Sequence, residues 1–429
     1  DHFHVCACGD HLTLGDDGAH VIAKHRLAAG VQRRGGLADL AKPEGRLAKL
    51  GLQAEAGQLI KQRADATARF TTTLVARDLA KPRKTRLLDR GEYNLPTGEP
   101  LQPDVLKAMN PFPEGEPRNR LGLARWLTSR EQPVVSRVLV NRIWQRVFGA
   151  GLVRTPEDFG LQGQQPTHPE LLDWLAVELH DSGWDLKHML RLMVNSRTFR
   201  QGSALRDGVN DPENKLWARG PHYRLDAEVL RDIALWASGL LDPHRGGEGV
   251  KPYQPAGYYS PMNFPKRKYS ADMNANQYRR GVYVHWQRQF LHPMLRAFDA
   301  PTREECTAQR PVSNTPLAAL TLMNDPTFVE AAKGFALRIL NEAGATDRQR
   351  LVWAWHTALG REPSNDELNV ARVFLGETRK RYQADAKAAD KLLAVGMLKL
   401  PVGMAKPETA AWTVLGQALL NLSETITRN

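Results

Sequence analysis

THPELLDWLAVELHDSGWDLKHMLRLMVNS, residues 167–196, contains two helices with recognisable ends and decides the fold class. Pro169 stands near the first helical position and Gly183 just past the last one, which is the usual asymmetry of helix ends. Asp185 is then placed to cap a second helix. The apolar side chains between these signals recur at helical spacing: Leu171, Leu172, Leu175 and Leu179 in the first helix, then Met189, Leu190 and Met193 in the second.

The same pattern recurs on both sides of this stretch. Helices are predicted at 119–127, 135–147, 226–238, 316–323, 326–339, 348–359, 364–375 and 407–422. Asn314 or Thr315 and Asp325 are expected to cap helices, as is the Ser-x-x-Glu capping box of Ser364 and Glu367. One short strand is expected at 282–286, where apolar and polar residues alternate. The predicted fold is mainly α: a multi-helix globular domain with long irregular Pro/Gly-rich loops and at most a few short strands.

Changes in composition predict five segments. Residues 1–66 form an atypical N-terminal segment that is expected to be poorly ordered or disordered, with weak helices at 35–69. Residues 67–118 form an extended strap rich in proline, which blocks long helices. The other three are a helical subdomain at 119–245, a basic and aromatic loop region with a short strand at 246–312, and a C-terminal helical subdomain at 313–429.

The composition is that of a globular protein, with 42% hydrophobic and 25% charged residues. It excludes a collagen and a small disulfide-rich fold. No apolar run approaches the length of a membrane span, and no signal-peptide pattern is present. The formal net charge of +12 favours polyanionic partners, and from Lys251 onward 24 basic residues face 16 acidic ones.

The strongest functional signal is the mixture of cations and aromatic rings at 251–290. Cations neutralise a polyanion, and ring faces stack on sugars or bases. The segment is therefore predicted to bind an anionic polysaccharide, and nucleic acid is not expected because no nucleic-acid motif is present. Alternatively, the tyrosines pack on their own scaffold and Lys266, Arg267 and Lys268 are a solvated tip. The ligand-binding residues predicted here are Lys251, Tyr253, Tyr278, Arg279 and Arg280.

A second polar string runs from Asp299 to Asp325. Guanidinium groups beside carboxylates can clamp an anion, and Cys306 between Arg303 and Arg310 could have a lowered thiol pKa. Asp299, Arg303 and Cys306 are the candidate catalytic residues, with Arg310, Asn314 and Asn324 as ligand-binding candidates. The structural alternative assigns the string to helix caps and to loop-anchoring arginines.

Two further groups of residues give weaker functional signals. Glu228, Arg231 and Asp232 share one side of a predicted helix, so Arg231 and Asp232 are candidate ligand-binding residues, although an intrahelical ion pair would also explain them. The N-terminal string of His2, His4, Cys6, Cys8 and Asp10 alternates and could hold zinc or copper only if the chain bends. No metal site is therefore assigned. The sequence shows no phosphate-binding loop, dinucleotide fingerprint or Gly-x-Ser-x-Gly.

Several segments in order resemble one known family. They include NRLGLARWL (119–127), VNRIWQRVFGAGLVRTPEDFGLQG (140–163), YRRGVY (278–283) and FDAPTREECTAQRPVSNTPLAALTLMNDPTFVEAA (298–332). The chain resembles, over residues 71–428, the C-terminal domain of unknown function of planctomycete cytochrome-c-domain proteins.

The resemblance implies an exported protein, periplasmic or at the cell surface, in which a cytochrome c domain and a second domain precede this one. Covalent haem attachment needs Cys-x-x-Cys-His, which VCACGDH (5–11) does not provide. No cofactor is therefore expected in this chain, and haem c is expected only on upstream domains or on a partner.

Three hypotheses follow. The chain binds or acts on an extracellular anionic polysaccharide, or it is a non-catalytic helical scaffold that docks a cytochrome c domain or an envelope partner. In the third, the 299–325 string forms the active site of a hydrolase or oxidoreductase. Convergence of Arg231, Asp232, Asp299, Arg303 and Cys306 in one pocket would favour an enzyme, whereas separate ion pairs would favour a scaffold.

Overall fold

The computed structural model describes residues 53–68, 75–79, 82–262, 266–288 and 290–428. The chain divides into two units, residues 1–77 and 78–429. In the first unit the described structure includes helix α4, Gln53–Ala68, within the region where weak helices were predicted. Nothing further of the predicted N-terminal segment, including the string from His2 to Asp10, can be assessed, because residues 1–52 lie outside the described ones.

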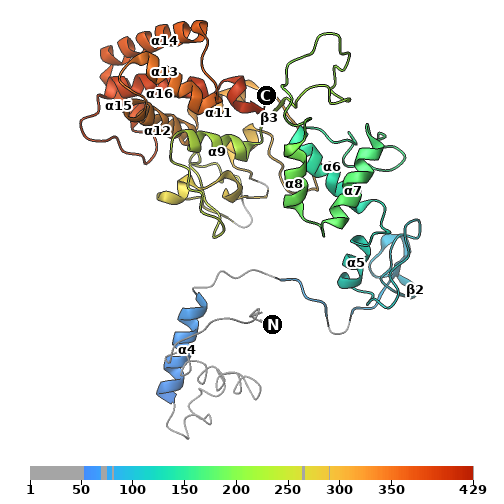
Figure 1. Ribbon diagram of the computed structural model, residues 1–429. Coiled ribbons are helices and arrows are strands. Elements are labelled where there is room, and N and C mark those ends of the chain that lie inside the picture. Colours follow the sequence, from blue (N-terminus) through green and yellow to red (C-terminus); the bar gives the residue numbers. More distant parts are fainter. Residues whose placement is uncertain (1–52, 69–74, 80–81, 263–265, 289, 429) are drawn as a thin grey trace, which may run out of the picture. The chain divides into compact units, whose positions relative to one another are not determined.

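The second unit is mainly helical, as predicted (Figure 1). It begins with the antiparallel hairpin of β1 and β2 and ends with β4, which pairs with β3. In chain order its elements are β1 (Thr85–Leu88), the 3-10 helix η1 (Asp89–Gly91), β2 (Pro96–Leu101), α5 (Arg120–Leu127), α6 (Val135–Phe148), α7 (Pro169–Asp181), α8 (Leu186–Asn195), β3 (Tyr223–Arg224), α9 (Ala227–Ala237), the 3-10 helices η2 (Ala275–Tyr278) and η3 (Gly281–Tyr283), α10 (Pro293–Ala297), α11 (Pro316–Asn324), α12 (Pro326–Glu342), α13 (Asp347–Leu359), α14 (Asn365–Ala384), α15 (Ala386–Leu393), α16 (Lys406–Leu420), α17 (Ser423–Ile426) and β4 (Thr427–Arg428).

The helix ends follow the capping signals of the sequence. The Asp185 carboxylate accepts from the backbone N–H groups of Lys187 and His188 at 2.8 and 3.1 Å. Thr315, rather than Asn314, caps α11, and Asp325 caps α12. The Ser364–Glu367 capping box is confirmed. Each cap satisfies backbone donors that the first turn of a helix leaves free.

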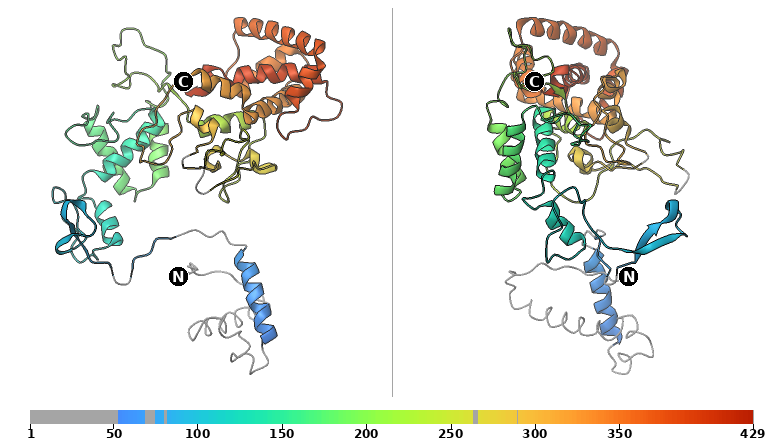
Figure 2. Two further views of the ribbon diagram at one scale, coloured as in Figure 1. Left: turned by 180° about the vertical axis from the view of Figure 1, so that it is seen from behind. Right: turned by 90° about the vertical axis from the view of Figure 1, so that its right-hand side faces the viewer.

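Two large hydrophobic cores organise the helices (Figure 2). Helices α6, α7 and α8 enclose the smaller one, in which the rings of Trp144 and Phe148 stack at 4.1 Å and Trp217 meets them edge-on. The larger core lies among α9 to α14 and α16, with Phe335 and Trp412 fully buried. Burial of this apolar surface is the main stabilising contribution.

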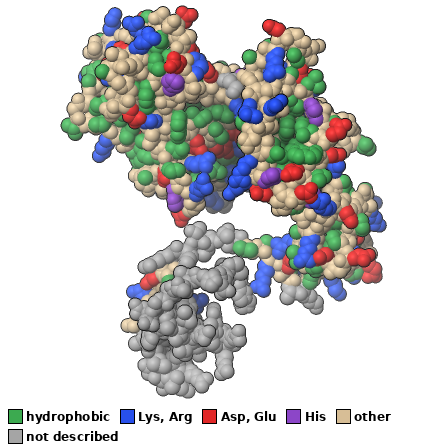
Figure 3. Space-filling view, viewed as in Figure 1, with side chains coloured by type: hydrophobic (Ala, Val, Ile, Leu, Met, Phe, Trp, Pro, Cys, Tyr) green, Lys and Arg blue, Asp and Glu red, His purple; other side chains and the backbone are tan. Residues whose placement is uncertain are grey.

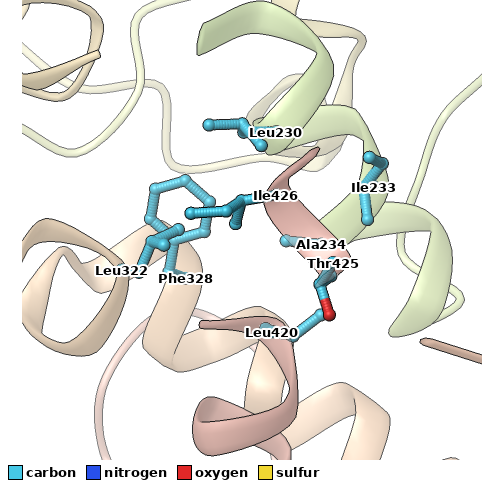
Figure 4. A pocket seen from close by; sticks show the side chains of 8 residues that line it. All are labelled: Leu230, Ile233, Ala234, Leu322, Phe328, Leu420, Thr425 and Ile426. Atoms are coloured by element: carbon cyan, nitrogen blue, oxygen red, sulfur yellow. The ribbon is translucent and has the colours of Figure 1, made fainter. Parts of the chain in front are cut away.

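The last residues of the chain complete the larger core. Ile426 of α17 projects between Leu230 of α9 and Phe328 of α12, beside a small apolar cavity of about 10 Å³ (Figure 4). Thr427 and Arg428 then pair with Arg224 and Tyr223. The C-terminus is therefore packed into the fold.

Two details differ from the sequence predictions. The predicted strand at 282–286 does not form: Gly281–Tyr283 is a 3-10 helix, and Val284 makes only an isolated bridge to Val250. A 3-10 turn satisfies the backbone of this short segment locally. Helix α14 runs on to Ala384, past the predicted end. None of the described helices combines the length and apolar content needed to cross a bilayer.

Candidate functional site

The candidate site is a cavity in one irregular loop, which we call the tyrosine loop (residues 251–272). Two backbone and side-chain contacts close its neck: Lys251 N donates to Asp272 Oδ2 and Asp272 N donates to the Lys251 carbonyl, both at 2.9 Å. Gln277, which is buried, donates its amide to the carbonyls of Lys251 and Asp272 at 3.1 and 2.6 Å. The loop therefore starts and ends at one fixed point.

Buried charged groups on the helices hold the segments around this neck. Arg231 of α9, fully buried, donates to the carbonyl oxygens of Gln277 and Arg279. Burial lowers its pKa to about 10, so it remains a cation at neutral pH. Irregular backbone cannot satisfy its own carbonyl groups as a helix does, and an arginine with five donors can supply what is missing.

Glu330 of α12 anchors the same region from a second helix. Its carboxylate is 1% exposed and accepts from the hydroxyls of Tyr253 and Tyr278, each at 2.9 Å, and from the backbone N–H of Leu398 at 2.5 Å. Burial, followed by the negative charge of Glu330, raises the pKa of both tyrosines. Both therefore act as neutral donors.

One turn further along α12, Lys333 fixes the chain that follows α15. Its ammonium is buried and donates to the carbonyls of Leu393, Val395 and Leu398 at 3.0, 2.7 and 2.7 Å. The three donors of the ammonium are thus all used. Helix α12 therefore joins the tyrosine loop to the turn after α15.

His292, the N-cap residue of α10, is a further buried group that bonds the tyrosine loop. It is 2% exposed, its Nε2 lies 2.9 Å from the carbonyl of Tyr253, and its Nδ1 accepts from the backbone of Met294. Burial lowers its pKa to about 4. The ring is therefore neutral at pH 7, with the proton on Nε2.

A cavity of about 680 Å³ opens within the tyrosine loop, in the size range of small-molecule sites. One side is aromatic: the Tyr259 ring meets those of Tyr269 and Phe290 edge-on, with centroids 5.3 and 5.8 Å apart, and lies 6.1 Å from that of Tyr258. The exposed cations Lys266, Arg267 and Lys268 also line the cavity. The described lining residues are Gln254, Pro255, Ala256, Gly257, Tyr258, Tyr259, Ser260, Met262, Lys266, Arg267, Lys268, Tyr269 and Ala271.

The three cations of this lining form no ion pair or hydrogen bond with any described residue, in contrast to most arginines of the domain. On the face shown in Figure 3, Lys and Arg side chains gather over the loop region that lies below α9 in Figure 1. Unpaired cations beside aromatic rings suit an anionic ligand with an apolar face.

Four of the five residues predicted to bind ligand in this region make internal side-chain contacts. Arg279 is 5% exposed, lies over the Tyr283 ring at 4.2 Å and donates to the carbonyls of Gly246 and Glu248. Arg280 pairs with Asp232, Nε to Oδ2 at 3.1 Å. Lys251 is the exception in this set, because its ammonium forms no hydrogen bond or ion pair with any other described residue. Tyr253 and Tyr278 are bound to Glu330, as described above.

The 299–325 string is likewise divided among separate contacts. Asp299 binds Arg224 at 2.6 Å and accepts from the backbone and hydroxyl of Ser313 at 2.8 Å, which joins the two ends of the 299–313 segment. Arg303 lies over the Trp286 ring at 3.8 Å, and Cys306 is exposed and free.

The remaining members of the string are anchors and helix ends. Arg310 forms a bidentate ion pair with Glu228, with N–O distances of 2.7 and 3.0 Å. Asn314 is exposed, and Asn324 bonds the carbonyl of Leu320 in its own helix. The intrahelical ion pair that could explain Glu228, Arg231 and Asp232 is not formed. Glu228 pairs with Arg310, whereas Arg231 and Asp232 both bond the 277–281 segment.

The structure thus forms no side-chain hydrogen bond or ion pair between any two of Arg231, Asp232, Asp299, Arg303 and Cys306, all of which are described residues. Sequence reasoning counted the cavity-lining residues Lys266, Arg267 and Lys268 among the cations of 251–290, with a solvated tip as the alternative, and did not select them as ligand-binding residues. The available signal was three consecutive cations between tyrosines and prolines. Among the described residues no group of His, Cys, Asp or Glu is arranged to hold a metal ion.

Fold and site together define a mainly helical domain with a cationic and aromatic loop. Residues 119–375 match the sequence profile of a family described as proteins of unknown function, DUF1553 (PSD1). The chain belongs to this family. The match spans α5 to α14 and includes the whole tyrosine loop. No curated protein and no solved structure matches the chain.

Proposed function

We propose that this chain is a binding domain that holds an anionic extracellular polysaccharide in the cavity of the tyrosine loop. The observation that carries the proposal is the set of three cations, Lys266, Arg267 and Lys268, which face a cavity of about 680 Å³ without an acidic partner among the described residues. An acidic group of the ligand would supply that partner, and the aromatic side would contact the apolar face of a sugar ring.

The anchoring of the loop supports binding over an incidental surface feature. Arg231, Glu330 and His292 are almost completely buried, and burying charged or polar groups costs free energy unless they are fully hydrogen-bonded. Here they fix both the neck of the loop and its surroundings. A binding loop held on a rigid scaffold loses less conformational entropy when the ligand arrives.

A direct test compares wild type with Lys266→Glu/Lys268→Glu on an array of anionic and neutral glycans at two salt concentrations. We expect salt-sensitive binding to acidic glycans by wild type and a loss of roughly tenfold or more in the variant. Lys387→Glu/Lys391→Glu is the matched control, because it changes the net charge equally at two exposed positions of α15. Equal losses in both variants, or no binding by wild type, would reject the proposal.

The second candidate function is a scaffold, and helix α11 favours it. The helix carries no charged residue, and while Ala318 and Leu322 are buried, Leu317, Leu320 and Met323 are 61, 53 and 49% exposed. A helix that is apolar on every side is usually covered. A cytochrome c domain or envelope partner would be the protein docked there. Leu320→Arg should abolish such docking and leave glycan binding unchanged.

The wider setting rests on the resemblance in sequence. We propose an exported protein, periplasmic or at the cell surface, in which haem c is carried by another domain or a partner. Fractionation of the native organism with an antibody against this domain would test the location, and a cytoplasmic signal would contradict it.

A further inference from the structure

One tyrosine of the loop differs from its neighbours in how its hydroxyl is used. The hydroxyls of Tyr258 and Tyr269 donate to the carbonyls of Leu291 and Pro252, at 2.9 and 2.6 Å. Tyr253 and Tyr278 donate to Glu330. Tyr259 is 8% exposed, yet its hydroxyl has no hydrogen-bond partner among the described residues. The hydroxyl is therefore free to bond a ligand or water in the cavity.

Tyr259 lines the cavity, and a buried polar atom without a partner lies in the same lining. Gln254 lines the same cavity, and its buried Oε1 has no partner among the described residues. A hydroxyl that can donate or accept and an amide therefore remain available inside one pocket. Neither group carries charge, so neither is explained by attraction of an anion alone.

The charged part of the pocket lies near this pair. Arg267 and Tyr259 line the same cavity. Burial raises the pKa of the Tyr259 hydroxyl, and the positive charge of Arg267 opposes that rise. A ligand that meets Arg267 through its acidic group would bring neighbouring atoms to Tyr259.

We propose that Tyr259 and Gln254 form hydrogen bonds with the free hydroxyls of a sugar unit whose acidic group is bound by Lys266, Arg267 and Lys268. The ligand class is then an acidic sugar with unsubstituted hydroxyls, such as a uronic acid unit. This inference rests on the proposed function and narrows it. Sites built to hydrogen-bond a hydroxyl discriminate strongly against ligands without one, because their polar groups are then left unpaired.

The test measures affinity for two probes of opposite character, an oligogalacturonate and an inorganic polyphosphate of similar charge. The variant is Tyr259→Phe, which removes one oxygen atom and keeps the ring. We expect roughly three- to tenfold weaker binding of oligogalacturonate and unchanged binding of polyphosphate. The slope of affinity against salt should stay the same, because no charge has changed.

Tyr382→Phe is the matched control. Tyr382 in α14 is 6% exposed, and its hydroxyl also has no hydrogen bond among the described residues, but it does not line the cavity. It should bind both probes as wild type does. Gln254→Leu is a second variant, expected to act in the same direction as Tyr259→Phe, and thermal unfolding of each variant checks that it is folded.

The outcomes separate the two proposals. If wild type binds oligogalacturonate and Tyr259→Phe binds it equally well, hydroxyl reading is overturned while anionic binding stands. If Tyr259→Phe weakens the binding of both probes to the same extent, the Tyr259 hydroxyl does not recognise sugar hydroxyls, and the inference also fails. If wild type binds neither probe, the proposed function fails and this inference fails with it.

Discussion

Replacing Glu330 with alanine tests whether the buried carboxylate of α12 holds the tyrosine loop in place. The carboxylate accepts three hydrogen bonds, from Tyr253, Tyr278 and the backbone of Leu398. Alanine removes the acceptor from all three donors at once. The two tyrosine hydroxyls come from the loop region and the N–H from the turn after α15, so the variant should loosen both segments.

The magnitude follows from the donors left behind. A buried donor without an acceptor costs about 1 to 3 kcal/mol. The tyrosines are half-buried and can turn partly toward water, so the lower half of that range applies to each. Three donors then give a loss of about 4 kcal/mol in the free energy of unfolding, close to the cost of breaking a buried ionic group. Glu330→Gln keeps one oxygen and should lose about 1 to 2 kcal/mol.

The assay is urea unfolding followed by tryptophan fluorescence, together with hydrogen exchange of amides in 251–272. Glu342→Ala is the control on the same helix, because Glu342 forms an exposed ion pair with Arg338 that should contribute less than about 1 kcal/mol. A loss below about 1 kcal/mol for Glu330→Ala, with unchanged exchange in the loop, would refute the reasoning.

Three further predictions use the same contacts. Gly396→Ala should destabilise the protein by several kcal/mol more than Gly403→Ala. Both positions have positive φ, but a Cβ at Gly396 would lie 2.3 Å from Glu330 Cδ, whereas a Cβ at Gly403 would meet open space. Equal melting temperatures of the two variants would contradict this. His292→Gln should remove a pH dependence. Because burial lowers the pKa of His292 from 6.5 to about 4, its unfolded form binds more protons between these values, so wild type loses up to about 3 kcal/mol relative to the variant as pH falls from 6.5 to 4; parallel stability curves would exclude it. Ile426→Ala should cost about 2 kcal/mol in chemical unfolding, since it enlarges an apolar cavity, and a change within error would show that the C-terminus contributes no packing.

The pH prediction needs the comparison with His292→Gln because Asp325 acts in the opposite direction. Burial raises the pKa of Asp325 to about 6, so the folded protein binds more protons than the unfolded one between about 4 and 6. That contribution stabilises the protein as the pH falls and is common to both proteins. The difference between them isolates the histidine.

Helix positions and caps were predictable because the interactions that set them are local. Asp185, Asp325 and Ser364 each bond backbone groups two or three residues away, so the residue types and their spacing contain the necessary information. The exposed side of a helix was less predictable. The apolar series Leu317, Leu320 and Met323 marks a helix, but it is the exposed side of α11, while Ala318 and Leu322 face the core.

The candidate site was predictable as a region and not residue by residue. Cations and aromatic rings at 251–290 indicated it, yet Arg279 is buried on carbonyl oxygens and Arg280 pairs with Asp232. Lys266 and Arg267 remain unpaired among the described residues and line the cavity. Composition cannot distinguish an arginine that satisfies its own backbone from one that faces a ligand.

The sequence by itself determined that the chain is mainly helical, where most of its helices begin and which loop concentrates cations and rings. Only the tertiary structure decided which charges are paired. Glu228 and Arg310 are 82 positions apart and Arg231 reaches a carbonyl 48 positions away, so their contacts exist only after α9 has packed against the loops. Caps depend on hydrogen bonds within one turn, whereas ion pairs depend on where distant segments meet, and burial of the apolar core decides that meeting.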